Sequence, residues 1–270
     1  MKINNFIEMQ FSNKTIWITG ATSGIGKAVA LEISKFNARL ILSGRNKLAL
    51  MEVADTCKKN GSSVLTVPFD LGDEQSVAAA VSEVADQKID CLYHFGGISQ
   101  RSFVQDTPLS VDRRIFEVNF FGTVALTKAV LPLMIKNGGG HMAVTSSIVG
   151  KFGFPYRSAY SASKHALHGF FESLRAENKK NNIRVSILIP GRIKTNISMH
   201  ALNNQGQPHG KMDEGQDKGM TSEQAAKIIC RKLVREKKEI LVGGVDLILV
   251  YIRRYIPCLY YFLSSKIKPL

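Results

Sequence analysis

The chain contains the segment Lys14-Thr15-Ile16-Trp17-Ile18-Thr19-Gly20-Ala21-Thr22-Ser23-Gly24-Ile25-Gly26. Its first six residues are a short run of the kind that forms a strand. Residues 27–36 then carry apolar side chains at helical spacing, which predicts a helix. A strand, a glycine-rich turn and a helix in this order form a context in which glycines let the backbone approach a pyrophosphate at the positive end of the helix. A tight turn packed for structural reasons is the alternative interpretation.

The glycine spacing is G-x-x-x-G-x-G, which differs from the G-x-G-x-x-G of the larger dinucleotide-binding group. The hypothesis of a cofactor-binding turn names six residues: Gly20, Thr22, Ser23, Gly24, Ile25 and Gly26.

Residues 39–43 read as a second strand, and Gly44-Arg45-Asn46 follows it. An acidic residue at the end of this strand would bind the ribose diol of NAD. Arg45 stands in that place, and its planar fork of donors suits a 2′-phosphate. The sequence therefore predicts NADP(H) as the cofactor rather than NAD. A solvated loop arginine is the alternative.

Further strands are predicted at 64–69, 91–95, 141–147, 185–189 and 239–242, and helices at 47–59, 73–87, 111–135, 159–178 and 222–235. This alternation predicts an α/β fold, a single Rossmann-type doubly wound parallel sheet flanked by helices on both faces. Ligands of such sheets bind beyond the carboxyl ends of the strands. One composite site is expected there, because these ends carry the Gly20 turn, Arg45, Asp70, Gly96, Ser147 and Pro190.

Asp70 and Leu71 close the third strand. A carboxylate there could accept a hydrogen bond from an adenine amino group, and Leu71 could cover the adenine ring. Asp70 as the N-cap residue of the next helix is an equal alternative.

Tyr160 and Lys164 lie four residues apart in a predicted helix, which puts them on one face. A free tyrosine has a pKa of about 10 and is a poor base near neutral pH. A nearby cation lowers that pKa, so the pair could move a proton on and off a substrate oxygen. A surface pair spaced by chance is the alternative.

In combination these residues resemble the short-chain dehydrogenase/reductase family. Thr19-Gly20-x-x-x-Gly24-x-Gly26 and Pro190-Gly191-x-Ile193-x-Thr195 match its two cofactor motifs, and Asn119, Ser147, Tyr160 and Lys164 match its catalytic tetrad. These motifs span residues 15–195. Residues 144–167 look most like the 11β-hydroxysteroid-dehydrogenase-like branch.

The resemblance implies a role for each tetrad residue. Tyr160 is expected to act as general acid in reduction and base in oxidation, and Lys164 to lower the pKa of Tyr160 and bind the nicotinamide ribose. Ser147 would polarise the substrate oxygen and Asn119 would hold a water in a proton relay. Ile193 and Thr195 would contact the carboxamide end of the nicotinamide.

The implied activity is reversible hydride transfer between NADP(H) and a carbonyl/alcohol pair, in a homodimer or homotetramer. A non-catalytic nucleotide-binding scaffold or sensor with this fold is the alternative, and the complete tetrad argues against it. One departure from the family concerns the segment after the fourth strand. The family usually has Asn-Asn-Ala-Gly there, whereas this chain has His94-Phe95-Gly96-Gly97, which puts local bracing of the sheet in doubt.

We expect a leader at 1–13, the catalytic domain at 14–244 and an apolar, basic tail at 245–270. Within the domain, residues 196–220 are polar and lack periodicity, which is typical of a substrate loop. Five apolar residues could line a pocket for a bulky or lipophilic substrate, or could be core: Ile148, Phe152, Phe154, Ile193 and Met199.

The tail combines aromatic and aliphatic side chains with Arg253, Arg254 and Pro257, followed by Lys266 and Lys268. Central arginines and a proline argue against a membrane-spanning helix. The composition favours a helix lying in a membrane interface, with packing on protein as the alternative. We expect a cytoplasmic protein, and contact of the tail with the membrane surface and packing of the tail on protein both stay open.

The net charge of +14 and the pI near 9.7 indicate an anionic partner. The basic residues are scattered, so a nucleic-acid partner is not expected. Four separated cysteines without C-x-x-C indicate neither zinc nor disulfides. His165 and His168 are interpreted as ordinary helix residues, and no metal is expected. The N-terminus lacks the apolar stretch of a signal peptide.

Overall fold

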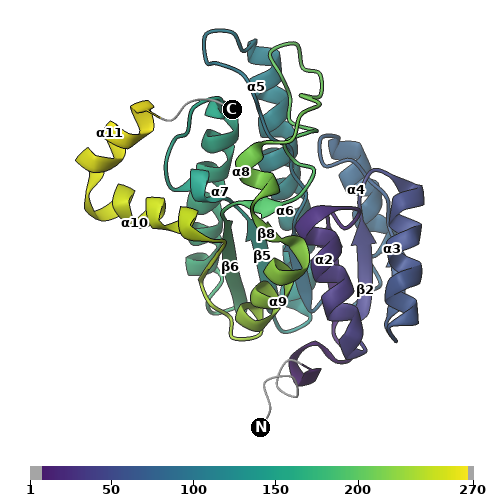
Figure 1. The fold of residues 1–270 in the computed structure, drawn as a ribbon. Helices are drawn as coiled ribbons and strands as arrows, with labels where there is room; N and C mark the ends of the chain where they lie inside the picture. The colour runs from purple at the N-terminus through teal and green to yellow at the C-terminus, as the bar shows by residue number, and fades with distance from the viewer. Residues whose placement is uncertain (1–7, 267–270) are drawn as a thin grey trace.

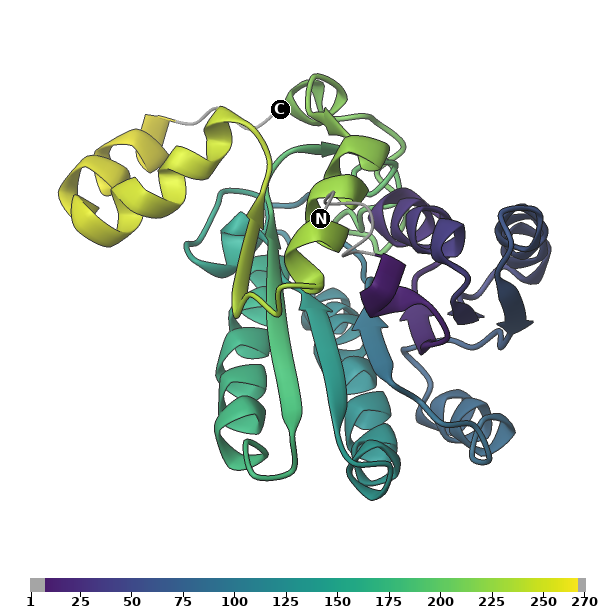
Figure 2. The same cartoon turned by 90° about the horizontal axis from the view of Figure 1, so that it is seen from below.

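The computed structural model describes residues 8–266, which form a seven-stranded sheet covered by helices on both faces (Figures 1 and 2). The strand order is β3-β2-β1-β4-β5-β6-β9, and every neighbouring pair is parallel. The strands are β1 (Thr15–Thr19), β2 (Arg39–Ser43), β3 (Ser63–Thr66), β4 (Cys91–His94), β5 (Gly140–Thr145), β6 (Ile183–Pro190) and β9 (Glu239–Val242). The predicted doubly wound fold is confirmed.

Side chains of β1 alternate between the two faces and so contribute to two cores. Ile16 and Ile18 pack with the first helical layer, whereas Trp17 packs with the second. The first layer contains α2 (Gly24–Ile33), α3 (Lys47–Lys59) and α9 (Ser222–Leu233). The second contains α4 (Glu74–Glu83), α6 (Gly122–Lys136) and α7 (Ser158–Glu177).

The boundaries of two elements differ from the sequence prediction. β3 stops at Thr66 because Pro68 has no amide hydrogen for the ladder. The first helix begins earlier than predicted, at Gly24, and ends in the 3-10 turn η1 (Ser34–Phe36). Residues 1–7 of the expected leader lie outside the described residues.

The predicted helix 111–135 consists of α5 (Leu109–Phe116), the π-helical turn η2 (Glu117–Phe121) and α6. By length and composition alone, the continuous helix Leu109–Lys136 could cross a membrane. In the fold its inner face is part of the core, since Leu126, Val130 and Met134 are fully buried.

The tail forms a helical hairpin of α10 (Ile248–Tyr255) and α11 (Pro257–Lys266), which projects from the body of the protein (Figure 1). Pro257 occupies the first position of α11, where its missing amide hydrogen costs nothing. The hairpin is attached through Tyr260, which is 4% exposed and packs against Phe152. Its hydroxyl donates a hydrogen bond to the carbonyl of Gly153. Lys268 lies outside the described residues.

The segment predicted as a loop at 196–220 is irregular only over residues 196–213, because the short helix α8 (Glu214–Asp217) forms within it. The two-residue strands β7 (Ile193–Lys194) and β8 (Met220–Thr221) pair with each other and close the base of this segment. The turn η3 (Ile148–Gly150) follows β5, and η4 (Val245–Leu247) precedes α10.

Replacing Gly122 by Ala tests how closely α6 approaches the turn after β3. A Cβ at Gly122 would lie 1.7 Å from the backbone oxygen of Leu71, so backbone must move. We expect Gly122→Ala to lower the free energy of unfolding by about 3 kcal/mol in urea denaturation. Gly169→Ala is the matched control, because no atom lies within 4 Å of that Cβ. It should stabilise α7 by up to about 1 kcal/mol. Equal effects of the two changes would contradict the close approach.

Candidate active site

A cavity of about 480 Å³ lies at the carboxyl ends of the strands. It gathers residues from the turns after β1 to β6 and from the loop that follows β7. The lining includes all but one of the residues predicted to be catalytic or cofactor-binding: Gly20, Thr22, Ser23, Gly24, Ile25, Gly26, Arg45, Asp70, Leu71, Gly96, Ser147, Tyr160, Lys164, Pro190, Gly191, Ile193 and Thr195. Asn119 is the exception, since it is fully buried behind the wall of the cavity.

The turn between β1 and α2 has a close backbone approach that leaves no room for a Cβ at Gly20 or Gly26. Gly20 has a φ of +67°, and a Cβ there would lie 2.6 Å from the amide nitrogen of Gly96. A Cβ at Gly26 would lie 2.3 Å from the carbonyl oxygen of Gly20. Ser23 at the N-cap of α2 makes no side-chain capping bond, so its hydroxyl does not occupy the first amides of the helix. These features fit a dinucleotide pyrophosphate.

Arg45 lines the cavity with an exposed side chain and makes no ion pair within residues 8–266. Asp70 lies nearby and is held in place, because Arg114 donates to it at 3.1 Å and the amide of Gly72 at 2.9 Å. Burial by itself would raise the pKa of Asp70, but the Gly72 amide, Arg114 and Arg45 outweigh burial and hold the pKa below its usual value. The N-cap of α4 is Asp73, so the alternative role of Asp70 as the cap is wrong.

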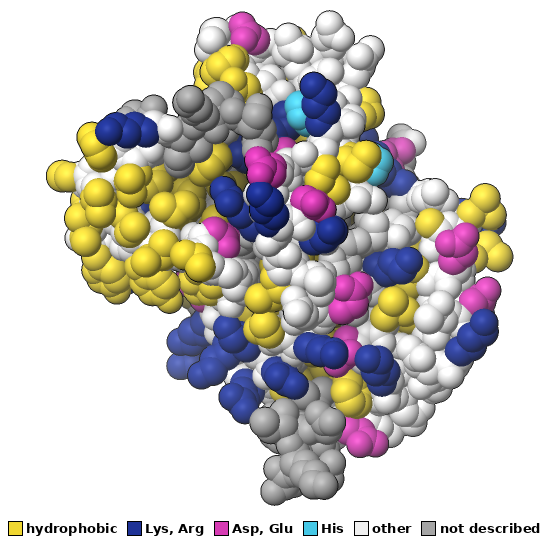
Figure 3. Space-filling model, in the orientation of Figure 1, with side chains coloured by type: hydrophobic (Ala, Val, Ile, Leu, Met, Phe, Trp, Pro, Cys, Tyr) yellow, Lys and Arg dark blue, Asp and Glu magenta, His cyan; other side chains and the backbone are white. Residues whose placement is uncertain are grey.

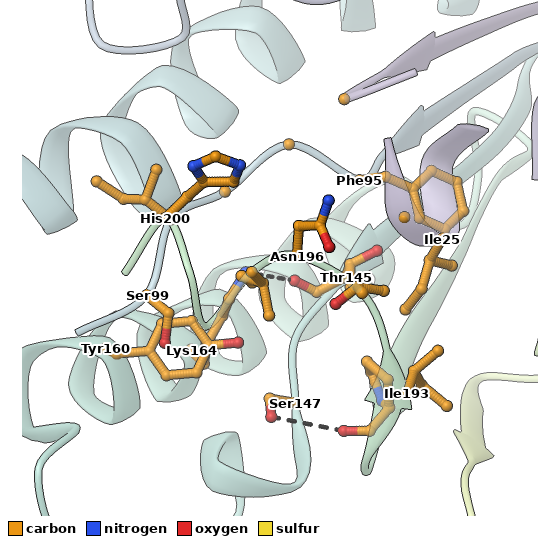
Figure 4. A pocket seen from close by; sticks show the side chains of 18 of the residues that line it. Ile25, Phe95, Ser99, Thr145, Ser147, Tyr160, Lys164, Ile193, Asn196 and His200 are labelled. Carbon is orange, nitrogen blue, oxygen red and sulfur yellow. Dashed lines mark hydrogen bonds between the residues drawn. The ribbon is translucent and has the colours of Figure 1, made fainter. Parts of the chain in front are cut away.

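Tyr160 and Lys164 project from the first turns of α7 into the cavity, and Ser147 faces it from the end of β5 (Figure 4). The Lys164 Nζ lies 5.7 Å from the centre of the Tyr160 ring and donates to the carbonyl of Thr145 at 2.7 Å. The Ser147 hydroxyl donates to the carbonyl of Pro190 at 3.5 Å, a weak bond that leaves the hydroxyl available to a ligand.

Burial has the largest effect on the pKa values of Tyr160 and Lys164. It raises the pKa of Tyr160 above the usual value, although Ser147, Arg101 and Arg157 act in the opposite direction. Burial also lowers the pKa of Lys164 to about 8. The expectation that Lys164 brings the pKa of Tyr160 below its usual value is therefore wrong for the protein alone, because loss of solvent outweighs the nearby cations.

Asn119 sits in the π-helical turn η2, a feature that often marks functional sites. Its side chain brackets Ile98, accepting from the Ile98 amide at 2.8 Å and donating to the Ile98 carbonyl at 2.9 Å. It also donates to the Ser163 hydroxyl at 3.0 Å. The Asn119 amide thus ties the turn after β4 to α7 close to Tyr160.

The unusual His94-Phe95 pair does not leave β4 unbraced. His94 is buried and its Nε2 pairs with the hydroxyl of Thr127 on α6 at 3.0 Å. Its ring also packs edge-on against Phe171 of α7. Burial lowers the pKa of His94 to about 3, so the ring is neutral at physiological pH. Phe95 lines the cavity.

Sequence reasoning missed Gln100, which holds the start of the helix carrying Tyr160. Gln100 is fully buried, and its side-chain oxygen accepts from the amide of Ala159 at 2.9 Å and from that of Tyr160 at 3.4 Å. Its amide group donates to the hydroxyls of Ser102, Thr107 and Ser158. Gln100 therefore acts as a remote N-cap that fixes α7.

Sequence reasoning also missed a buried cluster of two arginines and one carboxylate. Asp213, at the end of the 196–213 loop, accepts from the Arg101 Nε at 3.1 Å and from an Arg157 Nη at 2.8 Å. The Arg101 and Asp213 side chains are only 4% and 6% exposed. All three residues line the cavity, and the cluster fastens the loop beside Tyr160. No sequence signal marks this cluster, because its members are far apart in the chain.

His168 has carboxylates close by, which the sequence interpretation did not foresee. Its Nδ1 lies 3.9 Å from Glu172 and 4.0 Å from Glu239. By geometry this group could hold a cation. However, the Lys151 ammonium already contacts Glu239 at 2.5 Å and neutralises its charge. The absence of a metal therefore stays a prediction.

Replacing Asp213 by Asn should separate the loop from the body of the domain. The change leaves two buried guanidinium groups without their shared carboxylate, which costs about 3–5 kcal/mol. We expect a lower free energy of unfolding and faster proteolysis within residues 196–213. Asp217→Asn is the matched control, since Asp217 pairs with Lys194 at the surface and should contribute at most about 1 kcal/mol. Identical proteolysis of both variants would argue against the fastening role.

Comparison with known proteins identifies the family of the chain. The family described as short chain dehydrogenase matches residues 14–206. Dehydrogenase/reductase SDR family member 7B of Xenopus tropicalis is 41% identical over 261 residues, which cover 93% of this chain and 84% of that protein. The protein of the same name from Mus musculus is 40% identical over 94% of this chain and 81% of its own length.

Solved structures share the fold. A short chain dehydrogenase/reductase from Burkholderia phymatum, in complex with NAD, superposes with a TM-score of 0.82 at 22% identity, covering 97% of this chain and 98% of that one. L-Sorbose reductase from Gluconobacter frateurii, complexed with NADPH and L-sorbose, gives a TM-score of 0.77 at 25% identity, covering 89% and 98%. The family match, the relatives and the fold together establish that the chain belongs to the short-chain dehydrogenase/reductase family.

Proposed function

We propose that this protein is an NADP(H)-dependent oxidoreductase that interconverts a carbonyl and a secondary alcohol on a bulky or lipophilic substrate. The observation that carries the proposal is the shared cavity. A glycine cradle suited to a pyrophosphate and a Tyr160–Lys164–Ser147 group suited to proton transfer line the same space.

The proposed chemistry divides the work between cofactor and protein. The bound nicotinamide supplies or accepts the hydride. Ser147 donates to the substrate oxygen and polarises it, and Tyr160 gives a proton to that oxygen in reduction or removes it in oxidation. Lys164, a cation below about pH 8, binds the nicotinamide ribose and stabilises the developing phenolate. Asn119 holds α7 against the turn after β4 and anchors a proton relay.

The preference for NADP(H) rests on Arg45. This guanidinium has no carboxylate partner within residues 8–266 and borders the cavity at the end of β2, where the adenosine ribose of a dinucleotide lies in this fold. Asp70 and Leu71 border the same end and would contact the adenine ring. An unpaired guanidinium favours a 2′-phosphate over a ribose diol.

The proposed substrate class follows from the apolar part of the lining. Ile148, Phe154 and Ile193 line the cavity, whereas Phe152 is core and packs against Tyr260. Met199 is 37% exposed and lies outside the lining. The apolar lining next to Ser147 and Tyr160 suits a carbonyl attached to a bulky apolar group.

We also propose a peripheral, cytoplasmic membrane contact through α10–α11. The hairpin exposes many large apolar side chains: Val245, Ile248, Tyr251, Tyr255, Ile256, Leu259, Tyr261 and Phe262. They form a continuous apolar mass on the projecting end of the molecule (Figure 3). Leu249 at the root of the hairpin lines the catalytic cavity, which favours delivery of a lipophilic substrate from the membrane. Flotation with phosphatidylcholine vesicles, with and without phosphatidic acid, tests this contact, and protein that floats with neither would refute it.

For the oligomer we propose a homodimer or homotetramer built on the outer faces of the long helices α6 and α7. Phe121, 51% exposed at the start of α6, is an apolar side chain available to such a contact. Sedimentation at micromolar protein distinguishes the two assemblies from a monomer.

Replacing Tyr160 by Phe removes the proton donor and keeps the ring. We expect turnover of a bulky ketone with NADPH to fall at least about a hundredfold, while NADPH affinity measured by fluorescence changes little. Unchanged turnover would refute the mechanism. If the wild type binds NADPH tightly and turns over no ketone or alcohol, a nucleotide-binding scaffold is the better description.

The dependence of turnover on pH should show the loss of the Lys164 proton. Its pKa of about 8 means that the ammonium loses its proton as the pH rises through 8, so ketone reduction should decline there. Lys164→Arg keeps a cation at all accessible pH values. Its turnover should be lower but should not decline near pH 8. If turnover of the wild type and of Lys164→Arg declined in the same way near pH 8, the decline would belong to the titration of a group other than Lys164.

Replacing Arg45 by Ala should change cofactor choice more than turnover. Loss of the guanidinium should weaken NADPH binding by about tenfold to a hundredfold and leave NADH binding almost unchanged. Fluorescence titration with both nucleotides measures the ratio. Arg39→Ala is the control, because Arg39 is an exposed arginine at the opposite end of β2. An equal loss for both nucleotides in Arg45→Ala would contradict recognition of the 2′-phosphate.

A further inference from the structure

A second cavity, of about 400 Å³, opens between the α10–α11 hairpin and the turn that precedes α7. Its lining consists of Lys151, Phe152, Gly153, Pro155, His165, Arg253, Tyr260, Tyr261 and Ser264. Only Pro155 also lines the catalytic cavity. We call this second space the hairpin crevice. The proposed redox chemistry does not use it.

The lining of the hairpin crevice contains basic groups and no acidic one. Arg253 is half-buried, with its guanidinium 5.2 Å from the centre of the Tyr261 ring and 5.9 Å from that of Tyr260. It makes no ion pair with a carboxylate in the described part of the chain, residues 8–266. Aromatic stacking orients the guanidinium and leaves its donors free for an anion.

The other two basic residues of the lining differ in how their side chains are engaged. Lys151 pairs with Glu239, which lies outside the lining, so that its charge is largely offset. The His165 Nδ1 contacts the carbonyl of Ser161 at 2.8 Å, and its Nε2 has no hydrogen-bond partner among residues 8–266. The crevice therefore offers one unpaired guanidinium and one imidazole nitrogen to a ligand.

The surroundings of the crevice identify the kind of anion. Tyr261 belongs both to the crevice and to the exposed apolar surface of the hairpin. Figure 3 shows this apolar mass with Lys and Arg side chains gathered below it. A basic crevice bordered by an apolar, aromatic surface matches an amphiphile that has a phosphate next to acyl chains. The crevice presents positive charge, and a net charge of +14 gives a second copy of this chain no electrostatic preference for it.

We propose that the hairpin crevice binds the phosphate of an anionic phospholipid, with Arg253 as the main contact, in a membrane that the apolar side of α10–α11 enters. This inference rests on the proposed membrane contact. It adds a specific headgroup site to a surface that would otherwise bind any bilayer.

The test compares binding of the full chain to vesicles of phosphatidylcholine alone and of phosphatidylcholine with phosphatidic acid. The wild type should prefer the anionic vesicles by at least about tenfold. Arg253→Gln should lose most of this preference and keep its affinity for phosphatidylcholine. Arg253→Lys should retain part of it. Arg39→Gln removes one exposed charge at β2, far from the hairpin, and should behave as the wild type does.

Each outcome separates the alternatives. Equal loss of preference in Arg253→Gln and Arg39→Gln would mean that total charge, and no site, attracts the protein to anionic lipid. Equal loss in Arg253→Gln and Arg253→Lys would reduce Arg253 to a packing role. Binding of inorganic phosphate in solution that Arg253→Gln abolishes, together with no preference of the wild type for anionic vesicles, would assign the crevice to a soluble phosphate. Absence of binding to either vesicle would refute the membrane contact itself, while NADPH-dependent turnover would still test the proposed enzyme.

Discussion

The close contact between the turn after β1 and the turn after β4 is the constraint on which the site depends. Gly20 and Gly96 approach so closely that a single Cβ at Gly20 would meet the backbone of the other turn. The strand order reverses between these two strands, because β2 and β3 lie on one side of β1 and β4 leads to β5 on the other. Doubly wound sheets open a ligand crevice at such a point. The contact thus fixes the glycine turn after β1 relative to the part of the cavity that Ser147 and Tyr160 line.

The same burial that shapes the cavity sets the chemistry of its walls. Loss of solvent favours the neutral form of every ionisable group, so it moves the pKa of Tyr160 up and that of Lys164 down. The phenol keeps its proton while the ammonium becomes easier to discharge. Arg101 and Arg157 oppose the rise at Tyr160, and Asp213 compensates part of their charge. The 196–213 loop therefore contributes to the electrostatics of the phenol through the Asp213 carboxylate.

The features that could be predicted from the sequence are those that depend on residues close together in the chain. The periodicity of apolar residues predicts the strands and helices. In a parallel sheet the carboxyl ends of all strands lie at one edge, so the sequence alone predicts that Arg45, Ser147 and Pro190 line one site. Contacts between distant segments could not be predicted. Arg101 and Asp213 are 112 residues apart, and nothing in either segment indicates the other. The Gln100 cap of α7 and the pKa of Tyr160 were inaccessible for the same reason, since both depend on which groups tertiary packing brings together.

The α10–α11 hairpin is connected to the cavity at the carboxyl ends of the strands through the segment that follows β9. Asp246, just before α10, accepts from the amide of Arg192 at 2.6 Å, and the amide of Gly191 bonds the carbonyl of Val242. Both amides belong to the segment between Pro190 and Thr195 that lines the cavity. On the opposite side, Tyr260 fixes the hairpin to Gly153, next to Phe154 of the cavity wall. A force that moved α10–α11 would therefore move two walls of the cavity, because the Asp246 carboxylate and the Tyr260 hydroxyl are each bonded to the backbone of one wall.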